Sequence, residues 1–235
     1  MNNVEIIGSS HIAKQSITEI HKKIIDQKPE IVCVELDRTR FIGLFQKQKK
    51  KVSLKDLRFG GFGAAFMWIG RWLQKKLGDH VGIMPGADMK TAVLAARKVD
   101  AKIYLIDIPI QKTLYKLSKE VSLWEKAHLV IHIILSPLSK KNRDVASKID
   151  LTKVPSASLI ETMISDLKVK FPKIFKVLLD DRNEFMASQL KKISEKNPDK
   201  KIIAVVGAGH EKDLNILLEV KKPTTIKKNR KLLVK

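Results

Sequence analysis

The sequence predicts an α/β fold with a central mixed sheet, flanking helices and a helical insert. Strand-like apolar runs alternate with helical patterns over the first 110 residues, and another such run lies near the C-terminus, at 202–206. Alternation of this kind is typical of α/β domains. The chain has 235 residues and 44% hydrophobic residues, enough for a sizeable core.

A repeated phrase connects the first and last of these strands. The run at 4–9 leads into Gly8-Ser9-Ser10-His11, and the run at 202–206 leads into Gly207-Ala208-Gly209-His210. About 0.3 Gly-x-x-His phrases are expected by chance at ordinary residue usage. Carboxyl ends of parallel strands line the ligand crevice of an open sheet. The repeat therefore predicts that both strands lie in one sheet, with both histidines at the same edge.

The remaining elements follow in order along the chain. A helix is predicted at 13–27, and a second strand at 31–36 follows Pro29. The next predicted elements are helices at 39–49 and 64–77 on either side of a glycine-rich loop at 60–63, an alanine-rich helix that ends at Lys98, and a strand at 102–106.

The region 111–196 is predicted to be mostly helical, with breaks near Pro137, Pro155 and Pro172. A short helix after the last strand closes the fold at Glu219. We therefore expect one α/β domain over 1–220, with the helical insert at 111–196, and a basic, disordered tail at 221–235.

The net charge of +21 has two interpretations. Lysine and arginine total 46, against 25 acidic residues, which is compatible with a nucleic-acid-associated protein. Arginine, which makes bidentate contacts to phosphate and guanine, is scarce, so a solvated lysine surface is favoured. The tail remains a candidate for weak contact with nucleic acid or anionic lipid.

Compartment and membrane signals are few. Cys33 lies in an apolar run and is expected to be a buried thiol. There is neither a signal-peptide pattern at the N-terminus nor a stretch of 18 uninterrupted apolar residues. We expect a protein without a transmembrane segment, located in the cytoplasm or peripherally at the membrane.

Acidic residues at strand ends are candidates for chemistry. Glu35 and Asp37 share one face of their strand, and a buried carboxylate needs a partner or a metal. Glu35 could ligate an ion, act as a general base or pair with an arginine. Asp107 ends the next strand. Asp88 could cap a helix or supply another carboxylate.

Arg182 is the candidate cation of the same site. It lies near the start of a predicted helix, which Asp180 or Asp181 could cap. Its guanidinium could pair with Glu35 or hold an oxyanion. A surface ion pair is an equally good interpretation of the spacing.

At these residues the chain resembles the TraB/PrgY family, which is related to the TIKI proteases and more distantly to the erythromycin esterase and ChaN groups. The resemblance implies that two Gly-x-x-His motifs, a glutamate and an arginine gather at one site. In TIKI relatives it implies a divalent-metal-dependent protease, and in PrgY the shutdown of a peptide pheromone signal. The matching phrases are Ile7 to His11, Val34 to Arg40 (with Asp37 and Arg38), Pro85 to Met89, Asp107 with Thr113-Leu114, Asp181 to Asn183 with Met186-Ala187, and Val206 to His210.

Three departures from the family pattern stand out. Asp107 is followed by Ile108 where an Asp-Arg phrase is common, and Asp88 stands where glutamate is usual. The chain ends in a basic tail where many archaeal members continue into membrane helices.

Three functions follow as hypotheses. The first is a metal-dependent hydrolase of peptides, signalling peptides among them, or of small esters or amides. His11, Glu35 and His210 would bind manganese, cobalt or zinc, and Arg182 would stabilise the oxyanion. The second is a non-enzymatic protein that sequesters a peptide or cofactor. The third is a basic nucleic-acid-associated protein.

Overall fold

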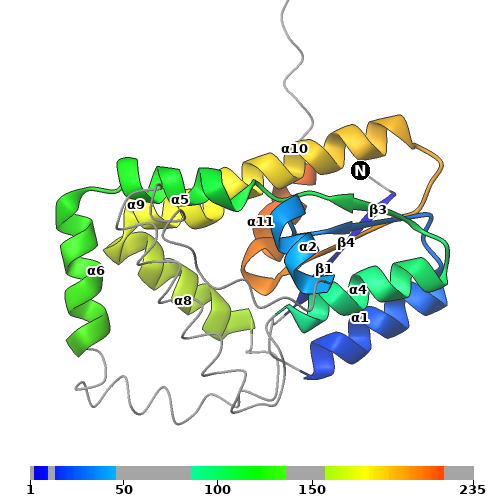
Figure 1. Cartoon of the computed structure of the whole chain (residues 1–235), viewed down its shortest axis with the longest axis horizontal. Helices are drawn as coiled ribbons and strands as arrows, with labels where there is room; N and C mark the ends of the chain where they lie inside the picture. The colour runs from blue at the N-terminus through cyan, green and yellow to red at the C-terminus, as the bar shows by residue number, and fades with distance from the viewer. Residues whose placement is uncertain (1–2, 10–13, 46–85, 136–156, 220–235) are drawn as a thin grey trace, which may run out of the picture.

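A computed structural model describes residues 3–9, 14–45, 86–135 and 157–219 of the chain (Figure 1). The helix expected at 64–77, the glycine-rich loop, Pro137, Pro155 and the tail at 221–235 lie outside these residues. The strands and helices below are those of the described part.

One four-stranded sheet forms the centre of the fold. Its strands are β1 (Val4–Ser9), β2 (Ile31–Val34), β3 (Lys102–Leu105) and β4 (Ile202–Gly207). They are arranged in the order β1-β4-β2-β3, so the first and last strands are neighbours, as predicted. All three pairings among these strands are parallel, whereas a mixed sheet was expected. Parallel neighbours require crossover connections, which helices supply here.

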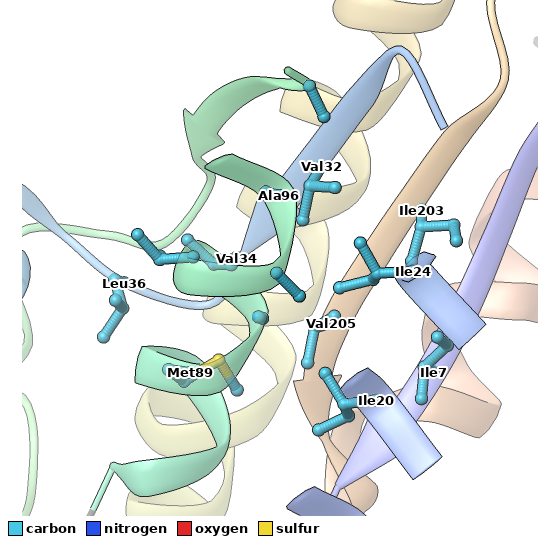
Figure 2. Close-up of a cluster of buried hydrophobic side chains, with 14 residues drawn as sticks. Ile7, Ile20, Ile24, Val32, Val34, Leu36, Met89, Ala96, Ile203 and Val205 are labelled. Carbon is cyan, nitrogen blue, oxygen red and sulfur yellow. The ribbon is translucent and has the colours of Figure 1, made fainter. Parts of the chain in front are cut away.

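Helices α1 (Lys14–Gln27) and α4 (Ala87–Lys98) cover one face of the sheet. Their buried side chains meet those of the strands in one apolar cluster, which Figure 2 shows in close-up. Alanines at 92, 95 and 96 are fully buried, so α4 packs closely on the strands. The labelled members of the cluster are Ile7, Ile20, Ile24, Val32, Val34, Leu36, Met89, Ala96, Ile203 and Val205.

Helices α10 (Asp181–Lys196) and α11 (Ala208–Glu219) pack against the opposite face. Met186 and Leu190 of α10 and Leu214 of α11 are fully buried against strand residues that point to this side. The sheet is therefore sandwiched between two helical layers, as in other α/β folds. This arrangement places the beginnings of α10 and α11 near the carboxyl ends of the strands.

The helical insert packs around its own small core. It consists of α5 (Ile110–Lys119), α6 (Leu123–Leu135), α8 (Ala157–Lys170), the short α9 (Pro172–Phe175) and a π-helical turn (Lys176–Asp180). Pro172 begins α9, which confirms the predicted break. Buried Glu125 of α6 accepts a hydrogen bond from the Ile174 amide at 2.9 Å, so it caps α9.

Two local predictions need correction. Neither Asp180 nor Asp181 caps α10 with its side chain, because the π-helical turn runs directly into the helix without a non-helical residue. Asp88 does not cap α4 either, because Gly86 occupies the N-cap position in a left-handed conformation (φ 79°). Helix α2 (Arg38–Phe45) confirms the described part of the helix predicted at 39–49, and residues 46–49 lie outside the described ranges. Within the described ranges, no helix has the length and apolar character needed to cross a membrane.

Candidate functional site

The two Gly-x-x-His phrases start side by side. In the β1–β4 pairing, Gly8 lies opposite Val206 and Ser9 lies opposite Gly207, so both strands end at the same edge. This confirms the predicted strand arrangement. His11 lies outside the described residues, and its distance to His210 stays a prediction.

Glu35 lies at the centre of the site. It directly follows β2, its backbone amide donates to the carbonyl of Val205 at 3.0 Å, and its side chain is 4% exposed. The Oε2 atom accepts a hydrogen bond from the Gly207 amide at 2.6 Å. The Oε1 atom accepts one from Arg182 Nη2 and lies 3.5 Å from His210 Nε2. Glu35 is therefore a buried carboxylate, held at the end of one Gly-x-x-His strand by a backbone amide and a guanidinium.

Arg182, on the first turn of α10, joins two buried carboxylates. Its Nε and Nη2 atoms donate to Asp107 at 3.1 and 2.7 Å, and Nη1 donates to the carbonyl of Leu178 at 3.2 Å. Burial alone would lower the pKa of Arg182, but the charges of Glu35 and Asp107 outweigh it and raise the pKa above its ordinary value. Of the alternatives left by the sequence, the structure shows the pairing with Glu35.

A second arginine, Arg40, completes this charge network. Its Nε donates to Asp37 at 2.8 Å and its Nη2 donates to Asp107. Asp37 also accepts the backbone amide of Thr39 at 2.7 Å, so it caps α2. Arg38, a predicted supporting residue, is exposed. Arg40 thus supplies a cation beside Asp107, where Ile108 follows the strand in place of the common arginine.

His210 opens α11 and is 6% exposed. Its Nδ1 lies 2.6 Å from Asn183 Oδ1, and Asn183 Nδ2 donates to Asp213 at 3.1 Å. Neither Asn183, which belongs to the matching phrase Asp181 to Asn183, nor Asp213 was among the predicted site residues. Asn183 directly follows Arg182, and Asp213 lies about one helical turn after His210. These positions alone are only weak evidence that the two residues belong to the site.

Three of the predicted supporting residues, Gly8, Asp88 and Gly209, differ in their surroundings. Ser9 donates to fully buried Asp88 at 2.6 Å, which joins β1 to α4. An added Cβ at Gly8 would lie 2.2 Å from Glu211 Oε2, so the absence of a side chain there leaves room for that carboxylate. Among the residues that the structure describes, the atom nearest to an added Cβ at Gly209 is Ile164 Cδ1, at an ordinary contact distance of 3.7 Å.

Asp181 forms its ion pairs with lysines of the helical insert. It pairs with Lys116 of α5 at 2.5 Å and with Lys176 of the π-helical turn. Burial raises the pKa of Asp181, but the hydrogen bonds from the two lysines outweigh that effect and lower it. These ion pairs connect the start of α10 to α5 and to the π-helical turn.

His128 and the cysteine have packing roles. His128 lies between the rings of Trp124 and Phe171, with centroids 5.0 and 5.2 Å away. Cys33 is fully buried, and burial raises the pKa of its thiol to about 12. Such a thiol is a poor nucleophile.

The donor set is partly suited to a metal ion. His210 Nε2 and Glu35 Oε1 are 3.5 Å apart, close to the roughly 3.3 Å between two ligands bonded at about 2 Å to one tetrahedral ion. The hydrogen bond between His210 Nδ1 and Asn183 is also typical of a metal-binding histidine. The residues between 3 and 219 that the structure describes form no group of three such donors. A third ligand would be His11, outside those residues.

Comparison with known proteins gives the family. The profile of the TraB/PrgY/gumN family matches residues 2–215. The chain belongs to the TraB/PrgY/gumN family. The chain is 39% identical over 210 residues to an uncharacterized protein of Methanocaldococcus jannaschii, an alignment that covers 88% of the chain and 51% of that protein.

Mammalian proteins are similar as well. TraB domain-containing proteins of Bos taurus and Homo sapiens are each 26% identical over 239 residues, which covers 89% of the chain and 60% and 61% of those proteins. The chain thus spans about half to three fifths of the length of these relatives.

Proposed function

We propose that this chain is a hydrolase of amide or ester bonds, with peptides as its main substrate class. The observation that carries the proposal is the buried contact between Glu35 and His210. Carboxylate and imidazole side chains are the usual groups for activating water, and these two face each other at the edge of the sheet where ligands bind in α/β folds.

Each residue has a role in this proposal. Glu35 would act as a general base or ligand, because Arg182 and the Gly207 amide both favour its ionised form. His210 would present Nε2 to the same water. Arg182 would orient Glu35, and its proposed second role is to stabilise an oxyanion.

A divalent ion, manganese, cobalt or zinc, would be held by His11, Glu35 and His210. Once bound, such an ion lowers the pKa of a coordinated water towards neutrality. Arg182 would then balance the negative charge of Glu35, whose Oε1 atom it contacts. The Asp107, Arg40 and Asp37 network would keep Arg182 in place.

Turnover of a fluorogenic peptide library and of nitrophenyl esters tests the proposal. Wild-type protein would be assayed without added metal and with manganese, cobalt or zinc. We expect His210→Ala and Glu35→Gln each to lower kcat/KM by about 10²-fold or more, the scale of general acid–base catalysis. His21→Ala, on α1, and Glu120→Gln, directly after the end of α5, are the matched controls.

Melting curves show whether each variant is folded at the assay temperature. Full activity in His210→Ala would contradict the proposal. If the wild type turned over no substrate under any of these conditions but bound peptides, the sequestering function would replace it.

A further inference from the structure

We propose that Asp213 is a positioning residue, which acts through Asn183 to fix the tautomer of His210. The three side chains form a line from the surface of α11 to the sheet edge, with distances of 3.1 and 2.6 Å. The inference rests on the proposed function only where it gives His210 Nε2 a catalytic use.

The outer end of the line is the carboxylate of Asp213. An ionised carboxylate only accepts hydrogen bonds, so Asp213 must face the NH₂ group of Asn183. The carbonyl oxygen of Asn183 then faces His210 Nδ1. Because that oxygen is also only an acceptor, Nδ1 must carry the proton.

This proton position determines the state of Nε2, the His210 nitrogen nearer to Glu35. With the proton on Nδ1, the neutral ring has its lone pair on Nε2, the nitrogen that faces Glu35 Oε1 at 3.5 Å. A lone pair at this position can accept a proton from water or bind a cation. The opposite tautomer would direct an N–H group at Glu35 and leave no lone pair on His210 Nε2 for a proton or a cation.

Without Asp213, the direction of the Asn183 amide would no longer be set. Its two ends are nearly equal in size, so rotation by 180° would present NH₂ to Nδ1 and favour a proton on Nε2. Asn183 is 2% exposed and Asp213 is half-buried. Both line a hollow of about 570 Å³ that α8, α9, the π-helical turn, α10 and α11 enclose together, and Glu184 lines it as well.

Nitrogen NMR of the metal-free full-length protein tests the inference. Long-range ¹H–¹⁵N spectra of histidine-labelled protein, recorded at about pH 8.5 where an ordinary imidazole is neutral, distinguish the two tautomers. His210→Ala assigns the signal. We expect Nδ1–H in the wild type and a loss of that preference in Asp213→Ala.

Glu184→Ala is the matched control, because it removes an acidic side chain from the same hollow without a hydrogen bond to Asn183. It should keep the wild-type spectrum. If Asp213→Ala is unfolded, Asp213→Asn replaces it, since an amide can offer either group and should weaken the preference too. Nε2–H in the wild type, or unchanged Nδ1–H in the folded Asp213 variant, would overturn the inference.

Activity gives a separate measurement. Asp213→Ala should lower kcat by roughly 10–100-fold, the range seen for residues that orient a ligand histidine, and leave KM almost unchanged. The NMR result stands even if the wild type hydrolyses nothing. Failure of the proposed function and failure of this inference are therefore distinguishable.

Discussion

Replacing Arg182 with leucine would remove a guanidinium that contacts two buried carboxylates. The side chains of Glu35 and Asp107 are 4% and 1% exposed. Removing one partner of a buried ion pair costs about 3–5 kcal/mol, because it leaves an uncompensated charge. Asp107 keeps Arg40 as a partner, so we expect a loss near the lower end, about 3 kcal/mol.

Urea unfolding followed by circular dichroism measures this loss. With a slope of about 1–3 kcal/mol per molar urea, the midpoint should fall by about 1–3 M. Arg38→Leu is the matched control, because Arg38 is exposed on α2, and it should change stability by about 0.5 kcal/mol or less. Equal midpoints for the two variants would refute the view that Arg182 neutralises Glu35.

Two further predictions concern the strand ends and the insert. Gly8→Ala should destabilise the protein by about 1–3 kcal/mol through the clash with Glu211. Gly209→Ala, within α11, should stabilise it by about 0.5–1 kcal/mol. Shifts of the same sign in the calorimetric melting temperatures of the two variants would contradict this. Asp181→Asn should destabilise the protein by about 0.5–1 kcal/mol at pH 7. Because folding lowers the pKa of Asp181, its contribution is present above the ordinary carboxyl pKa of about 3.9 and is lost as the pH falls through the lower folded value. A difference between Asp181→Asn and wild type that stays constant from pH 7 to pH 2 would be inconsistent with that linkage.

The sequence was sufficient to predict the four described strands, the pairing of the first strand with the last, and the contact of Glu35 with Arg182 as one alternative. Short apolar runs predicted all four described strands, and the repeated Gly-x-x-His phrase paired β1 with β4. The pairing of Glu35 with Arg182 was one of the alternatives that followed from their positions at a strand end and a helix start.

Other contacts depended on tertiary packing that the sequence does not encode locally. Arg40, and not the exposed Arg38, reaches Asp107 because α2 begins directly after Asp37 and turns the third residue inward. Asn183 joins His210 to Asp213 only because α10 and α11 pack side by side. The parallel direction of the whole sheet likewise follows from the crossover helices.

The most direct test of a single hydrolytic centre is the non-additivity of its two Gly-x-x-His histidines. Turnover would be measured for His11→Ala, His210→Ala and the double variant, with the metal that supports the highest wild-type rate. If both histidines act in one centre, each single variant should lose nearly all activity and the double variant should lose little more. Losses that multiply in the double variant, or full activity in either single variant, would contradict a shared centre.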